Sequence, residues 1–111
     1  MSENSESPST EVVHHPHRHR YVLLADGREL GFTQYIDSGD DRVFVHTEID
    51  PAEEGHGYGS TLIRGALQQV REEGLRIAAT CPFVTAWLEK HHDFDDIVDP
   101  VSIEMRASLR E

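Results

Sequence analysis

The chain has 111 residues, of which 37% are hydrophobic and 28% are charged, and its formal net charge at pH 7 is −11. This size and composition are typical of one small, water-soluble globular domain with a single core. The acidic charge argues against a nucleic-acid-binding surface, which needs clustered Lys and Arg side chains, and no apolar segment approaches the roughly 18 residues of a membrane-spanning helix.

Residues 1–19 are rich in Ser, Glu, Pro and His and have no apolar periodicity, which predicts a flexible tail before a single domain at residues 20–111. Residues 1–8 have neither the basic start nor the apolar stretch of a signal peptide, so we expect a cytoplasmic protein. The four histidines between 14 and 19 are interpreted as part of the tail, and no metal site is expected. The single cysteine, Cys81, cannot form an internal disulfide.

Three β-strands are predicted between residues 21 and 49, joined by tight turns. The first strand, residues 21–25, precedes Asp26-Gly27, a strong hairpin signal because glycine readily adopts positive φ. In the second strand, residues 29–36, two sets of side chains alternate between the faces. The third strand, residues 42–49, is expected to place one set of side chains on one face and a second set on the other: Val43, Val45, Thr47 and Ile49 against Phe44, His46 and Glu48.

The second half of the chain predicts two helices with a strand between them. Apolar residues follow a period of 3.6 from Leu62 to Val70, which predicts a helix that Gly74 ends. A short strand is expected at residues 75–79, and Pro82 suits the first turn of a second helix that extends to about residue 91. The remaining segment, through Val101 and Ile103 to Leu109, is ambiguous between a strand and a short helix. Together the elements predict an α/β fold with a mixed sheet, in which three antiparallel strands precede a β-α-β-α unit.

A glycine-rich turn, with Gly55, Gly57 and Gly59, lies between the third strand and the first helix. Successive glycines let the backbone approach a ligand closely, and the free N–H groups and dipole at a helix start favour an anion. A pyrophosphate is therefore the natural ligand. A turn that needs glycine only for its backbone angles explains the same spacing. The turn has no Gly-Lys-Ser/Thr ending, so it is not a P-loop.

Two separated segments resemble the GNAT superfamily of N-acetyltransferases, and in particular its small single-domain, YjdJ-type branch. The first segment runs from His46 to Pro51 and continues from Glu54 to Ser60, and the second is Cys81-Pro82-Phe83-Val84. The resemblance covers roughly residues 21–98. It implies a GNAT-like fold that uses acetyl-CoA as co-substrate, with the pantetheine arm where the third strand and the strand at 75–79 splay apart. It assigns these residues to coenzyme A: Ile49, Glu54, Gly55, His56, Gly57, Tyr58, Gly59 and Ser60.

Acetyl transfer to an amine needs a deprotonated amine, a polarised thioester carbonyl and a stabilised leaving thiolate. His46 and Glu48 share one strand face, about 7 Å apart along the chain, and are the two candidate general bases. Cys81 follows the fourth strand, where the resemblance implies a position beside the thioester. It is either a functional thiol or an ordinary buried cysteine. The tyrosine that many GNAT enzymes use as general acid corresponds here to Leu88.

Two functions follow from these residues. The leading hypothesis is an N-acetyltransferase with an unidentified primary amine as acceptor. Because Asp26-Gly27 replaces the helices with which larger GNAT enzymes shape the acceptor pocket, an open site for a protein or peptide amine is expected. The alternative is a non-catalytic module that binds coenzyme A or acyl-CoA and acts through a protein partner. A structural domain without a ligand is the weakest interpretation.

Overall fold

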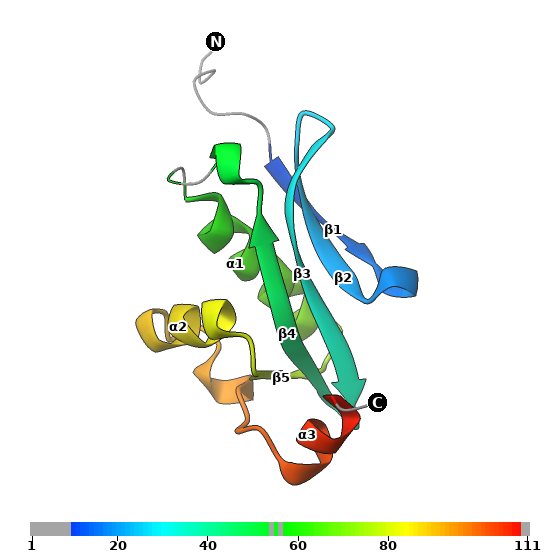
Figure 1. Cartoon of the computed structure of the whole chain (residues 1–111). Helices are drawn as coiled ribbons and strands as arrows, with labels where there is room; N and C mark the ends of the chain where they lie inside the picture. The colour runs from blue at the N-terminus through cyan, green and yellow to red at the C-terminus, as the bar shows by residue number, and fades with distance from the viewer. Residues whose placement is uncertain (1–9, 54, 56, 110–111) are drawn as a thin grey trace.

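A computed structural model of the chain describes residues 10–53, 55 and 57–109. They form a five-stranded mixed sheet with the strand order β1-β2-β3-β4-β5 and helices on both faces (Figure 1). The strands and α-helices have these bounds: β1 Thr10–His15, β2 Arg20–Ala25, β3 Arg28–Ser38, β4 Asp41–Ile49, α1 Tyr58–Glu72, β5 Arg76–Ala79, α2 Pro82–Lys90 and α3 Ile103–Leu109. Short 3-10 helices lie at Pro16–Arg18, Pro51–Glu53 and Asp95–Ile97.

The predicted α/β fold is confirmed. β2, β3 and β4 pair antiparallel, and β5 pairs with β4 in parallel. The apolar stripe of α1 is fully buried against one face of the sheet, where it packs on Tyr21, Leu23 and Phe44. A smaller cluster on the other face joins Met105 of α3 to Val43 and Ala78. α3 therefore covers only the end of the sheet where β4 begins (Figure 1).

The ambiguous C-terminal segment is helical at residues 103–109. Before this helix, Val98 forms only an isolated parallel bridge with Ile77. Gly74 has a φ of +77°, in keeping with the predicted end of α1. Within the described part of the chain, no helix is both long and apolar enough to cross a membrane.

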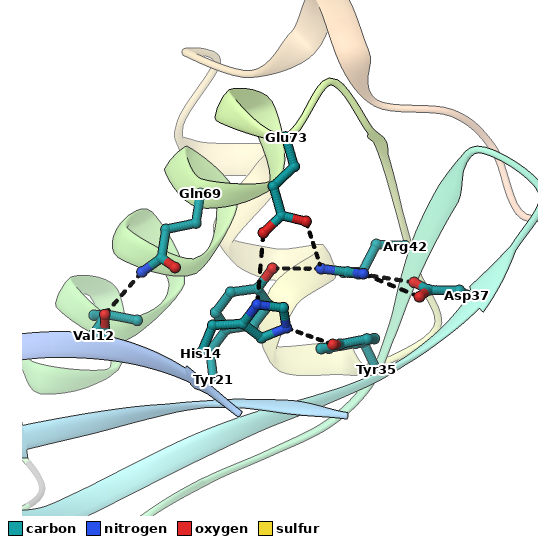
Figure 2. Close-up of polar contacts among 8 residues, drawn as sticks. All are labelled: Val12, His14, Tyr21, Tyr35, Asp37, Arg42, Gln69 and Glu73. Carbon is teal, nitrogen blue, oxygen red and sulfur yellow. Dashed lines mark hydrogen bonds and ion pairs between the residues drawn. The ribbon is translucent and has the colours of Figure 1, made fainter. Parts of the chain in front are cut away.

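The predicted flexible tail over residues 1–19 is wrong for residues 10–19, because residues 10–15 form β1. This strand pairs with β2 from Thr10↔Ala25 to His15↔Arg20. Val12 packs against α1 at Gly65, where a Cβ would overlap its side chain, and Gln69 donates a hydrogen bond to the Val12 carbonyl at 2.8 Å (Figure 2). The strand is thus formed by contacts distant in sequence, which leave little trace in its own composition. Residues 1–9 lie outside the described residues.

Arg42 is the centre of a polar cluster that joins the sheet to the end of α1 (Figure 2). Its side chain is 8% exposed and donates two hydrogen bonds to the Asp37 carboxylate, at 2.8 and 3.0 Å. It also donates to the Tyr21 hydroxyl at 2.8 Å and to Glu73 at 3.4 Å. Burial raises the pKa of Tyr21 to about 12, although the Arg42 guanidinium acts in the opposite direction, so the phenol stays neutral.

His14 fixes β1 to the same cluster. Its ring stacks on Tyr21, its Nε2 is hydrogen-bonded to the Tyr35 hydroxyl, and its Nδ1 lies 3.6 Å from Glu73. Burial, reinforced by the Arg42 charge, lowers the pKa of His14, so the imidazole is neutral at neutral pH. The first strand is therefore fixed by specific polar contacts of His14 and Val12 as well as by apolar packing.

We expect Arg42→Met to lower the free energy of unfolding by about 2 kcal/mol. The substitution leaves the buried Tyr21 hydroxyl and the Asp37 carboxylate without their donor. The loss is smaller than for a fully buried ion pair because the Asp37 and Glu73 side chains are 48% and 42% exposed and water can solvate them. Urea unfolding measures the change. Arg42→Lys is the matched control, with about half the loss, because it keeps the charge but not the fork geometry. An unchanged midpoint for Arg42→Met would contradict the assigned role.

Candidate functional site

The sheet splays at the middle of β4, as predicted. β5 pairs only with residues 41–44 of β4. Thr80 and Cys81 both donate their backbone N–H groups to the Phe44 carbonyl, at 3.0 and 3.1 Å, and the chain then turns into α2. The second half of β4, from Val45 to Ile49, has no pairing with β5 among the described residues.

A groove of about 600 Å³ opens at this splay, between the end of β4, the glycine-rich turn and the start of α2. It is lined by Thr47, Glu48, Ile49, Pro51, Gly55, Gly57, Tyr58, Gly59, Ser60 and Phe83. Six of the eight residues that the sequence assigned to the cofactor are among them. The other two, Glu54 and His56, lie outside the described residues. The sequence assignment omitted Thr47, Pro51 and Phe83.

The turn has the backbone conformation that glycine supplies. Gly55 and Gly57 have φ values of +92° and +77°, and Gly57 immediately precedes α1. A Cβ at either position would meet no atom within 4 Å. Glycine is thus favoured at both positions because other residues are strained at these backbone angles. Lack of space for a side chain is not the reason. The start of α1 presents backbone N–H groups and the positive end of the helix dipole to this turn, which favours an anion there.

Gly59 serves a different purpose from the two glycines before it. A Cβ on Gly59 would overlap the Phe83 ring, which packs over the first turn of α1 and is 42% exposed. Nearby, the Trp87 indole donates a hydrogen bond to the Ser60 hydroxyl oxygen at 2.8 Å. These contacts hold α2 against α1 and make Phe83 one wall of the groove. The third glycine of the turn was the only sequence signal of this close approach.

A β-bulge in β4 changes which side chains share a face. Gln34 pairs with His46 and Tyr35 pairs with Phe44, so Val45 is an extra residue without a partner in β3. The predicted grouping of side chains along this strand is therefore wrong. Phe44, Thr47 and Ile49 lie toward the main core, and Val43, Val45, His46 and Glu48 lie on the opposite side. The predicted shared face of His46 and Glu48 is retained, since both follow the bulge.

His46 and Glu48 form a hydrogen-bonded pair, of which Glu48 lines the groove. His46 Nε2 lies 2.8 Å from a Glu48 carboxylate oxygen, and the two side chains are 53% and 61% exposed. An ionised carboxylate only accepts hydrogen bonds, so the Nε2 atom carries the hydrogen. The Nδ1 atom of a neutral His46 is then free to accept a proton, and the imidazolium that results is stabilised by Glu48.

Cys81 lies on the other side of β4 from this pair. It is 3% exposed at the start of α2, and its thiol donates a hydrogen bond to the Thr47 hydroxyl at 3.4 Å. Thr47 is in turn 2.9 Å from the Thr33 hydroxyl. The structure thus brings Cys81 to the residue between the two candidate bases and not to the bases themselves. Leu88 packs against the main core.

Comparison with known proteins gives one family match. The family model for GCN5-related N-acetyl-transferases matches residues 20–97. No curated protein sequence matches the chain. The fold is similar to that of a GCN5-like candidate N-acetyltransferase from Staphylococcus aureus, with a TM-score of 0.63 and 21% identity over 84% of this chain and 91% of that chain.

Two larger solved structures match more weakly. The PaiA N-acetyltransferase of Thermoplasma acidophilum, in complex with coenzyme A, is 18% identical over 50% of this chain and 35% of its own, with a TM-score of 0.46. The ribosomal-protein-alanine N-acetyltransferase of Brucella melitensis biovar Abortus 2308 is 15% identical over 72% of this chain and 62% of its own, with a TM-score of 0.48. Both are too distant to support an argument about this chain.

Proposed function

Because this chain belongs to the GCN5-related N-acetyl-transferase family, we propose that it transfers an acetyl group from acetyl-CoA to a primary amine. The observation that carries the proposal is the groove at the splay. There the positive-φ glycines and the start of α1 meet the half of β4 that does not pair with β5. Its volume of about 600 Å³ is in the range of small-molecule sites.

In this proposal the turn binds the pyrophosphate and β4 borders the pantetheine arm. Gly55, Gly57 and the first residues of α1 offer backbone N–H groups to the anion. Glu54 and His56 belong to the same proposed site on the sequence resemblance alone. Ile49 and Phe83 add apolar walls to the groove.

The candidate bases act on the acceptor amine. Its nitrogen attacks the thioester carbonyl, and its proton passes either to Nδ1 of His46 or to Glu48. The hydrogen bond between the two side chains supports the first route, because Glu48 holds the imidazole in the tautomer that leaves Nδ1 free. Both side chains are accessible from solvent, which suits an acceptor that reaches the sheet from outside.

The thiolate of coenzyme A needs a proton once the carbon–sulfur bond breaks. Leu88 has none to give, so we assign this role to Cys81 or to the protonated His46. A Cys81 thiolate could instead accept the acetyl group and pass it to the amine, but the thiol then has to lose the proton that it donates to Thr47. A protein or peptide amine is one candidate acceptor, because the His46 and Glu48 side chains are more than half exposed and Asp26-Gly27 forms a tight turn in place of pocket-shaping helices.

The alternative function is a module that binds coenzyme A or acyl-CoA and signals to a protein partner. The absence of an acidic group at Leu88 favours it. Such a module would bind coenzyme A in the same groove as the proposed enzyme and would differ only in that it transfers no acetyl group.

Calorimetric titration with acetyl-CoA and with coenzyme A, followed by an assay of amine-dependent coenzyme A release, tests the proposal. We expect micromolar binding, backbone NMR shifts centred on residues 55–60, and release only when an amine is present. Binding without release for any amine would favour the binding module. No binding at millimolar ligand would reject both functions.

A further inference from the structure

Arg20 lies beside the candidate bases on the open face of the sheet. It pairs across the sheet with Gln34, and Gln34 pairs with His46, so the three side chains share one face. The Arg20 guanidinium lies 4.0 Å above the centre of the Phe32 ring, and this ring is 6.0 Å from that of His46. The Arg20 guanidinium and the His46 imidazole are therefore neighbours of the same aromatic ring, that of Phe32.

The charge of Arg20 has no carboxylate partner among the described residues, and its Nε atom is buried without a hydrogen bond. This is unusual in a chain with a net charge of −11. Other arginines of the sheet and of α1 are paired: Arg42 with Asp37, Arg64 with Asp93, Arg71 with Asp96 and Arg76 with Asp99. A ligand cannot reach the buried Nε atom, but the two terminal nitrogens of the guanidinium are not buried and have no hydrogen bond to a described residue, so an anionic ligand group would bind them.

We propose that the acceptor is a primary amine that also carries an oxyanion, with Arg20 as the residue that binds the oxyanion. This inference rests on the proposed function. The guanidinium fork matches the geometry of a carboxylate or a phosphate. The amine lies at His46 and Glu48, and the part of the acceptor between its two ends crosses Phe32.

The dimensions and the field of this face agree with such an acceptor. The Arg20 guanidinium lies 4.0 Å and the His46 ring 6.0 Å from the centre of the Phe32 ring. The guanidinium and the imidazole are therefore no farther apart than the sum of these two distances, which a short flexible acceptor can span. α3 packs beside this row, on Val43 and Val45, and the His46 and Glu48 side chains remain 53% and 61% exposed. An acceptor with one positive and one negative end is also not repelled by the acidic protein.

The test compares matched amines in the coenzyme A release assay with the full-length protein. β-Alanine, γ-aminobutyrate and ε-aminocaproate are paired with propylamine, butylamine and hexylamine, in which a methyl group replaces the carboxylate. Phosphoethanolamine, paired with ethylamine, distinguishes phosphate from carboxylate. We expect kcat/KM to be at least about tenfold higher for the anionic member of the best pair, the effect of one charge-assisted contact.

Arg20→Gln should remove this preference, lowering kcat/KM about tenfold for the anionic amine while leaving the alkylamine and the affinity for acetyl-CoA unchanged. Arg20→Lys keeps the charge and should retain part of the preference, which separates charge from misfolding. The matched control is Arg18→Gln, which removes an exposed charge two residues away and should change neither amine.

Equal turnover of both members of every pair, or an equal loss on both in Arg20→Gln, would overturn the inference and leave the acetyltransferase intact. Acetyl-CoA binding with no turnover of any amine would overturn the transferase function itself, and the inference with it.

Discussion

Replacing both His46 and Glu48 with glutamine should lower kcat/KM for acetyl transfer about a thousandfold, with less than about a twofold change in the affinity for acetyl-CoA. A positioned general base typically contributes factors of about 10² to 10⁴. Glu48 lines the groove and is hydrogen-bonded to His46, so these are the two candidate bases. Glutamine keeps the hydrogen-bonding character of the site but accepts no proton. Steady-state kinetics with a calorimetric titration measure both quantities.

The two single variants identify the base. If His46 takes the proton, His46→Gln loses as much activity as the double variant, and Glu48→Gln loses less because it only orients and stabilises the ring. If Glu48 takes the proton, the order is reversed. The two losses should not add, since the side chains are hydrogen-bonded and act as a unit.

The exposed pair formed by His92 and Asp95 is the matched control. Its side chains are also hydrogen-bonded, at 3.0 Å, and neither lines the groove. Replacing both with their neutral counterparts should leave kcat/KM unchanged. Full turnover in the His46 and Glu48 double variant would reject the general-base assignment for both residues.

Gly57→Glu should weaken acetyl-CoA binding about a thousandfold while the protein remains folded. Space around the position is open, with no atom within 4 Å of a Cβ, so the new side chain extends into the groove instead of into the core. There its carboxylate repels the pyrophosphate at the start of α1. The φ of +77° adds backbone strain of about 1–2 kcal/mol for any other residue.

Two further variants separate these causes. Gly57→Ala carries the strain alone and should weaken binding by no more than about tenfold. Gly57→Gln adds the bulk of Glu without its charge, so the difference between Gln and Glu measures the electrostatic part. Circular dichroism and calorimetry provide the readouts. A folded Gly57→Glu protein with wild-type affinity would place the cofactor elsewhere.

Features that depend on neighbouring residues were predictable from the sequence. Asp26-Gly27 forms the expected hairpin turn, with φ values of 53° and 84°. The apolar stripe of α1 and its end at Gly74 follow from a helical period and one glycine. The glycine turn that borders the groove was also predictable, because the positive φ values of Gly55 and Gly57 are a local property of the backbone that glycine favours. In each case the chain conformation is determined within a few residues.

The remaining features depend on contacts between distant segments, and no local pattern carries them. β1 exists because Val12 packs on Gly65 and His14 reaches Tyr35, more than twenty residues away. The bulge at Val45 is a matter of register between β3 and β4, and it reverses the side-chain alternation on which the prediction for that strand relied. Such a register is determined only in the assembled sheet, because it depends on all the residue pairs between the two strands together.

The same reason separates the two parts of the candidate site. The sequence alone predicted the glycine turn, His46, Glu48 and Cys81 as its components. The tertiary structure alone decided that Cys81 contacts Thr47, that Phe83 closes over Gly59 and that Arg20 lies one ring away from His46. Residue types reveal which chemistry is available, whereas the folded packing of strands and helices determines which groups meet.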